Sequence, residues 1–147
     1  MKIQKIATLI LMSILTGTAL SSETITDHRQ AIYLDRQERM VVLEEMRAFL
    51  STLQQITQGV VGNDMNQVSS AARKMGSGAS NEVSASLVSK LPLSFKTLAA
   101  DTHEKFDQIA LDASSFAEKD HTLEQVVVLM RNCVVCHEMY RIELEED

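Results

Sequence analysis

The sequence is poor in the residues that usually mark β-rich or disordered proteins. Its 147 residues include one proline, five glycines and no tryptophan, and aromatic residues make up only 4%. Sheet proteins normally use more aromatic residues, and more Gly and Pro at their turns, so the composition favours helices. A single proline also excludes a collagen-like or proline-rich chain. The hydrophobic share of 45% and the charged share of 23% are typical of one folded globular domain.

Positive charge is scarce as well. The chain has 14 Lys and Arg against 20 Asp and Glu, which gives a formal net charge of -6, and it contains no basic run. Proteins that bind nucleic acid normally present clustered Lys and Arg to the phosphates. We therefore expect no nucleic acid among the partners of this chain.

The N-terminus has the pattern of a secretory signal peptide. Lys2 and Lys5 precede an apolar run over residues 6–15, and small or polar residues follow. The run is too short to span a bilayer, which takes about 20 apolar residues; an uncleaved anchor is the rival interpretation. We expect residues 1–21 to be removed and residues 22–147 to form one periplasmic domain without a membrane span. Removal leaves 12 basic and 20 acidic residues, a net charge of -8.

Apolar residues recur at steps of three or four, the spacing of amphipathic helices. The predicted helices cover residues 27–58, 65–75, 93–116 and the chain from 121 onward, with a weaker segment at 82–89. The expected core-facing residues are Leu43, Met46, Leu50, Leu53 and Val60 in the first helix, and Leu123, Val127, Met130, Val134, His137 and Leu144 in the last. No alternating strand pattern is evident. Four helices with short connections predict an all-α, antiparallel four-helix bundle.

The only two cysteines belong to one short motif, Cys133-Val134-Val135-Cys136-His137. In an exported protein, the Cys-x-x-Cys-His spacing is typical of c-type haem attachment. Residues three apart share one face of a helix, so the two thiols can each bond one vinyl group of a porphyrin. His137 can then bind the iron from the proximal side. The sequence therefore predicts one covalently bound haem c near the C-terminal helix.

Three other interpretations of the cysteine pair remain open. A thioredoxin-like pair normally begins a helix after a strand, whereas this motif lies deep inside a predicted helix. A zinc site needs about four ligands, and the other histidines do not form a second ligand pair: His28, His103 and His121. A disulfide between Cys133 and Cys136 fits an oxidising compartment, although closing so short a loop gains little stability.

The C-terminal segment resembles the class II cytochromes c, which comprise the cytochromes c′ and their low-spin relatives. The resemblance rests on Cys133-Val134-Val135-Cys136-His137-Glu138-Met139-Tyr140-Arg141. The stretch Leu91-Pro92-Leu93-Ser94-Phe95-Lys96, followed by Thr102-His103 and Phe106-Asp107, is similar to a periplasmic branch of these monohaem proteins. The resemblance implies haem c at one end of a left-handed four-helix bundle, with His137 as the proximal ligand. Relatives often form homodimers through their first two helices, which allows a homodimer here.

The resemblance also implies that a residue of the first helix faces the distal side of the iron. An apolar residue there leaves the iron five-coordinate, whereas a Met closes the sixth site. The candidates are Met46, Met40 and an open site beside Leu43. In the family an Arg often precedes the distal position by four residues, which favours Met40 or Leu43. Spacing from the end of the helix favours Met46 instead.

The apolar stripe decides between the two methionines. Met46 lies inside the stripe, whereas Met40 lies near its polar boundary, so we predict Met46 as the distal ligand. Without a haem, a Met in such a stripe would simply fill the core. We expect His103 to be structural or exposed. Arg141 is expected to meet a haem propionate, or else to pair along the helix with Glu138 or Glu145.

The leading functional hypothesis is a periplasmic monohaem c-type cytochrome that transfers single electrons between redox partner proteins and is not an enzyme. Cys133, Cys136, His137 and Met46 would bind the haem, and His137 and Met46 would ligate the iron. The alternative is a five-coordinate, cytochrome c′-like protein that binds NO or CO. A third interpretation is a helical interaction module without haem. The acidic surface suits a basic partner.

Overall fold

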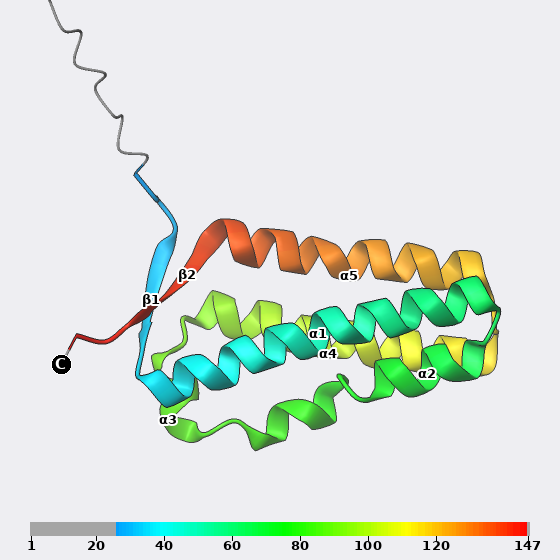
Figure 1. Ribbon diagram of the computed structural model, residues 1–147, viewed down its shortest axis with the longest axis horizontal. Coiled ribbons are helices and arrows are strands. Elements are labelled where there is room, and N and C mark those ends of the chain that lie inside the picture. Colours follow the sequence, from blue (N-terminus) through cyan, green and yellow to red (C-terminus); the bar gives the residue numbers. More distant parts are fainter. Residues whose placement is uncertain (1–25, 147) are drawn as a thin grey trace, which may run out of the picture.

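The computed structural model describes residues 26–146, without the side chains of residues 80–82; the expected signal peptide at residues 1–21 lies outside this range. The elements in chain order are β1 (Gln30–Leu34), α1 (Arg36–Gly62), α2 (Met65–Arg73), the 3-10 helix η1 (Ser77–Glu82), α3 (Ala85–Lys90), α4 (Leu93–Ser115), α5 (Lys119–Met139) and β2 (Tyr140–Leu144). The described chain is therefore mostly helical, with one small sheet at one end (Figure 1). No helix within it is long and apolar enough to cross a membrane.

The ends of the helices follow from local capping. Asp35 and Glu38 form a capping box at the start of α1, in which the Asp35 carboxylate accepts from the Glu38 amide at 2.8 Å. The Asp64 carboxylate caps α2 by accepting from the Gln67 amide at 2.9 Å. Pro92 stands directly before the first residue of α4. The helices predicted over residues 65–75 and 93–116 are confirmed, with ends shifted by one or two residues.

The two strands correct the all-α prediction. β1 pairs with β2 in parallel, from Gln30 opposite Tyr140 to Leu34 opposite Leu144. Residues 30–34 were expected to be helical, and Leu144 was expected on a helical stripe. In β1 the side chains of Ile32 and Leu34 are buried while Tyr33 between them is exposed, which is the two-residue period of a strand. The pattern is only five residues long, and its partner strand lies at the other end of the chain.

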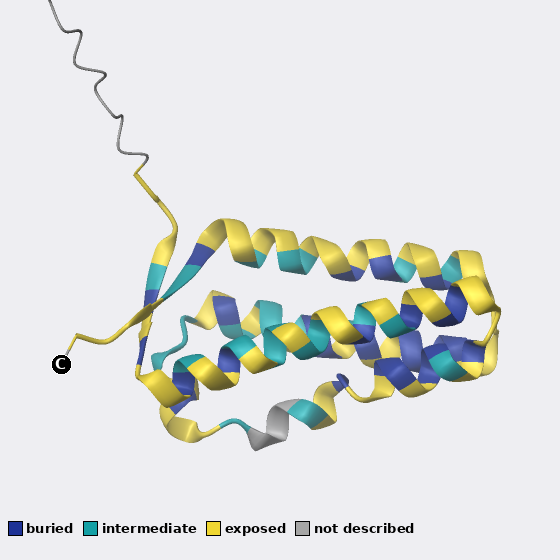
Figure 2. Ribbon diagram, viewed as in Figure 1, coloured by how far each residue is buried: buried dark blue, intermediate teal, exposed yellow. Residues whose placement is uncertain are grey.

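The buried side chains form two clusters along the long axis of the molecule (Figure 2). The larger one joins α1, α2, α4 and α5 away from the strands, and its fully buried members include Ile56, Val68, Phe106, Ile109 and Leu129. The smaller one joins the two strands to the near ends of the helices; its members are Ile32, Leu34, Val42, Leu87, Phe95 and Tyr140. The two ends of the molecule thus have separate clusters of buried side chains.

The predicted core faces are wrong in two places. Leu50 on α1 is 70% exposed, and the predicted stripe of α5 points outward. The buried face of α5 consists instead of Thr122, Val126 and Leu129, and the half-buried Cys133 and Cys136 follow at the same spacing. α5 carries two apolar rows with helical spacing, and periodicity alone does not tell which row faces the core.

A buried acidic residue, Glu38, connects the elements at the end of the fold where the strands lie. The Glu38 carboxylate accepts from the Lys90 ammonium at 2.7 Å and from the Ser86 hydroxyl at 3.0 Å. Lys90 lowers the pKa of Glu38 below its usual value. The same ammonium lies 2.8 Å from the Glu145 carboxylate, just after β2. A single lysine of α3 therefore ties the start of α1 to the end of the chain.

Candidate functional site

A cavity of about 330 Å³ opens beside the C-terminal end of α5. Its walls come from α1, α4, α5, β2 and the segment just before β1. Five residues supply an apolar interior: Leu43, Met46, Phe95, Cys136 and Tyr140. Its remaining lining is largely polar and charged: Asp27, Arg29, Arg39, His137, Arg141, Ile142 and Glu143. The volume of this cavity lies in the range of small-molecule and cofactor sites. Such sites combine apolar walls with a few polar groups at defined positions, as this lining does.

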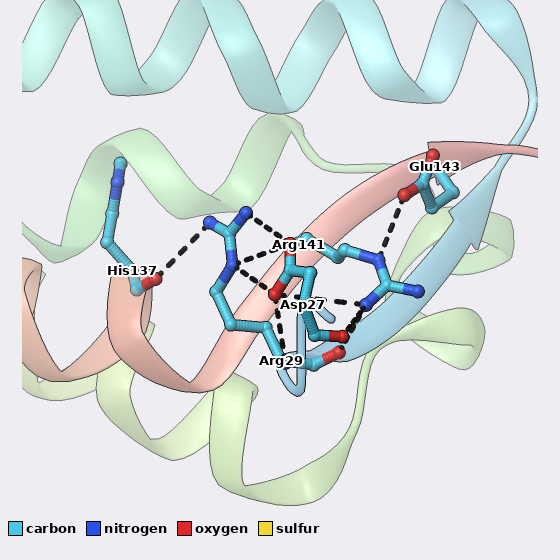
Figure 3. Close-up of polar contacts among 5 residues, drawn as sticks. All are labelled: Asp27, Arg29, His137, Arg141 and Glu143. Carbon is cyan, nitrogen blue, oxygen red and sulfur yellow. Dashed lines mark hydrogen bonds and ion pairs between the residues drawn. The ribbon is translucent and has the colours of Figure 1, made fainter. Parts of the chain in front are cut away.

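The predicted haem-binding motif lies at this cavity. Cys133, Cys136 and His137 occupy the last two turns of α5. Cys136 packs against the cluster near the strands, whereas Cys133 packs against the larger cluster one turn away. Cys136 and His137 line the cavity. The His137 side chain is exposed and has no hydrogen-bond or ion-pair partner among residues 26–146, while its carbonyl accepts from the Arg29 guanidinium at 3.5 Å (Figure 3).

The environment of the two thiols differs from that of a catalytic redox pair. Cys133 and Cys136 are free and half-buried, and burial raises the pKa of both thiols. Redox cysteines instead have pKa values lowered by a helix N-terminus or by neighbouring cations. Here the thiols lie at the C-terminal end of α5, where the helix dipole also disfavours a thiolate. Within residues 26–146, no three His, Cys, Asp or Glu side chains are grouped to hold a metal ion.

The distal candidates separate into two groups. Met46 and Leu43 both line the cavity, and Met46 is half-buried against the cluster near the strands. Met40 is 52% exposed and borders a different hollow on the outer side of α1, together with Arg36 and Glu44. Of the three residues considered from the sequence, Met46 and Leu43 therefore share the cavity with His137, and Met40 does not.

Three arginines line the cavity, Arg29, Arg39 and Arg141, and Figure 3 shows the polar contacts of Arg29 and Arg141. The Arg29 guanidinium bonds the Asp27 carboxylate, with a shortest distance of 2.6 Å, and holds the pKa of that carboxyl well below its usual range. The Arg141 guanidinium donates to the carbonyls of Asp27 and Arg29 at 2.9 and 2.8 Å. The guanidinium of Arg39, the third cation, has no hydrogen bond or ion pair to another described residue. Sequence analysis missed Asp27 and Arg29, because the pairing of the two strands brings them to the site.

The surroundings of Arg141 differ from the expected helical pairing. Its Nε donates to Glu143 at 2.9 Å, not to Glu138 or Glu145. The reason is that Arg141 belongs to β2, where residues two apart share one side of the strand. The expected contact of Arg141 with a propionate stays a prediction, and the position of Arg141 in the cavity wall is compatible with it.

Of the two expectations for His103, the structural one is confirmed and the exposed one is wrong. The residue is buried on α4, and its ring lies against Phe49 with centroids 5.2 Å apart. Nδ1 lies 2.8 Å from the Met75 carbonyl, which only accepts, so Nδ1 carries the proton. Nε2 lies 3.4 Å from the Glu45 carboxylate. His103 therefore connects α1, α4 and the end of α2 through a buried polar bridge.

This bridge is expected to make the stability of the protein depend on pH. The Glu45 carboxylate is the main cause of a raised pKa at His103, and the Met75 carbonyl and the charge of Asp107 act in the same direction. The stabilisation is fully present below the unfolded-state pKa of about 6.5, and it is lost as the pH rises through the raised pKa of the folded state. We expect a higher urea midpoint at about pH 6 than at about pH 8.5.

Two neighbouring variants test this effect. Glu45→Gln removes the partner charge and is expected to flatten the dependence of the urea midpoint on pH. Glu44→Gln is the matched control, since Glu44 is exposed and has no contact with His103. An equal pH dependence in the Glu45→Gln and Glu44→Gln proteins would contradict the assignment to His103.

Comparisons with protein-family models, with curated proteins and with solved structures give no match to this chain.

Proposed function

We propose that this protein is a periplasmic monohaem c-type cytochrome that carries single electrons between redox proteins. One observation carries the proposal: Cys136, His137 and Met46, which belong to distant parts of the sequence, line the same cavity. The proposal includes the finer fold, an antiparallel bundle of α1, α2, α4 and α5 with haem c at the strand end. The resemblance of the motif to class II cytochromes c supports it, together with the signal-peptide pattern of residues 1–21.

The residues around the cavity fit a haem. Leu43, Phe95 and Met46 give apolar contact to a porphyrin and exclude water from its faces. The guanidinium groups of Arg29, Arg39 and Arg141 match the carboxylates of two propionates in charge and geometry. Arg39 is the best placed to accept a new partner, since its charge is not used by another described residue. A bound haem supplies an iron that alternates between the ferric and ferrous states.

The thiols and the axial residues have separate roles in this proposal. Cys133 and Cys136 lie three apart on one helix, so their sulfurs would hold the haem through two thioether bonds, each S–H adding across one vinyl group. His137 and Met46 would hold the iron and would leave no open site for a substrate. Thioether ligation raises the reduction potential relative to two nitrogen ligands. Outer-sphere electron transfer, not catalysis, is the function that such a closed site supports.

Leu43 supports a second candidate function. It lines the same cavity as Met46, and it lies four residues after Arg39, the spacing often seen in the family. If Leu43 faces the iron, the sixth position is open and the protein binds NO or CO instead of shuttling electrons.

The absorption spectrum of the exported protein tests the proposal and separates the two candidates. The chain is produced in a host with cytochrome c maturation, and ferric and ferrous spectra are recorded with and without CO. We expect a low-spin spectrum with the weak far-red band of Met-to-iron ligation, unchanged by CO. A high-spin spectrum shifted by CO would favour the gas-binding candidate. A colourless protein would refute haem binding, with the Cys133→Ala/Cys136→Ala protein as the reference without covalent haem.

A further inference from the structure

The outward side of α5 carries an apolar row that no other element among residues 26–146 covers. Leu123, Val127, Met130 and Val134 are 42%, 56%, 48% and 55% exposed. We call these four residues the outer seam. Figure 2 shows that the upper side of α5 is largely exposed. The outer seam is separate from the cavity, whose α5 residues are Cys136 and His137.

The spacing of the outer seam is that of a coiled coil. Its steps of four, three and four residues repeat the a and d positions of a heptad, with Val127 and Val134 at a and Leu123 and Met130 at d. Coiled-coil helices bury such a seam against a second helix. The periodicity that predicted a core face for these residues therefore describes a real helix-packing surface, although the chain's own fold does not bury it.

Three charged residues border the outer seam at intervals of seven. Glu124, Arg131 and Glu138 occupy the e positions of the same heptads, and all three are exposed. None of their side chains forms a hydrogen bond or ion pair with another residue of the described chain. The g positions inside the seam hold Val126 and Cys133, which carry no charge, and Lys119 occupies the preceding g position as the first residue of α5. Between Leu123 and Val134, charge therefore lies on one side of the outer seam only.

The apolar seam and the charges beside it favour one partner and one relative direction of the two helices. We propose that a second copy of this chain packs antiparallel against the outer seam. In an antiparallel pair e positions face e positions. A parallel pair would place Arg131 and Glu138 against the uncharged Val126 and Cys133, and only Glu124 would meet a charge, that of Lys119 at the first residue of α5. Placing Val127 against Met130 of the second copy, and Leu123 against Val134, uses the whole seam. The same register sets Arg131 of each copy beside Glu124 of the other, which gives two ion pairs.

The neighbouring register is disfavoured on the same grounds. Moving the second helix by one heptad would face Arg131 with Arg131, and Glu124 with Glu138, so like charges would meet at the interface. The helices are already held in the fold of each copy, so the pairing does not have to order them. The dimer uses α5, not the first two helices, and leaves both cavities open at opposite ends.

Sedimentation of the full exported protein over a wide range of concentration tests this interface. We expect a monomer–dimer equilibrium in the wild-type protein and a monomer in Val127→Glu. Val61→Glu is the matched control, since Val61 is 82% exposed on α1, and it should dimerise like the wild type. A wild-type protein that stays monomeric would overturn the proposal, as would a Val127→Glu protein that still dimerises.

Charge exchange tests the direction and the register. Arg131→Glu and Glu124→Arg should each weaken the dimer, and the double variant should restore it. The double variant Arg131→Glu/Glu138→Arg should not restore the dimer. If this variant dimerises and Arg131→Glu/Glu124→Arg does not, the proposed register is wrong. Circular dichroism checks that each variant is folded. Sedimentation does not depend on haem, so the dimer and the haem proposal can fail separately.

Discussion

Met46→Leu is expected to abolish the far-red band of the ferric protein and to let the ferrous protein bind CO. The substitution removes the only thioether in the cavity wall, and the proposed sixth ligand with it. The reduction potential should fall at the same time, because thioether ligation favours the ferrous state. Absorption spectra with and without CO, together with a redox titration, measure all three changes.

Leu preserves the volume of Met, so the packing around residue 46 should change little. A swap of this kind in a core usually costs less than about 1.5 kcal/mol. Met40→Leu is the matched control: the same chemical change on the outer side of α1 should leave the band, the potential and the CO response unchanged. Loss of the band in Met40→Leu but not in Met46→Leu would reverse the ligand assignment. If the wild-type protein already binds CO, the assignment of Met46 as the sixth ligand is contradicted.

Phe106→Ala is expected to destabilise the protein by about 3–5 kcal/mol, the usual range for deleting a buried aromatic ring. Phe106 has no exposed surface, and it lies at the centre of the larger cluster. Its ring is nearly parallel to that of Phe49, with centroids 5.5 Å apart. Removal therefore leaves a cavity among α1, α2 and α4 and also ends the aromatic contact. The free energy of unfolding from urea titration measures the loss.

Phe116→Ala provides the control for this change. Phe116 is 67% exposed just after α4, so the same truncation there should change stability by no more than about 0.5 kcal/mol. The haem spectrum of folded Phe106→Ala should match the wild type, since Phe106 is not part of the cavity wall. An equal loss of stability in the two variants would contradict the assignment of the larger cluster as the main core.

Sequence patterns predicted the helices well where local signals define their ends. Asp64 before α2 and Pro92 before α4 act within one turn of the helix, so their effect is visible in the sequence alone. The strands were missed because β1 exists only through its pairing with β2 at the far end of the chain. A five-residue alternation is too short to be recognised without that partner.

The candidate site was likewise predictable where local sequence patterns define it, and not where it depends on the pairing of distant segments. The spacing of Cys133, Cys136 and His137 predicts haem chemistry, which stays a prediction, and the apolar stripe of α1 selected Met46, which lines the cavity. The positions of Arg29 and Asp27 depend on the strand pairing, so the arginine network was not foreseen. The outer seam shows the reverse case, in which a correct periodicity was assigned to the wrong side of α5.

The parallel pairing of the two strands fixes the order in which the chain can finish folding. Gln30 and Tyr140 are partners although they lie 110 residues apart in the sequence. Contacts of such high contact order form late, because a long loop must close first. During synthesis β1 has no partner strand until residues 140–144 have been made, and Ile32 and Leu34 stay uncovered until then. A ribosome-bound chain is therefore incomplete at the cavity end, and removal of residues 140–147 should leave the far core folded while this end stays open.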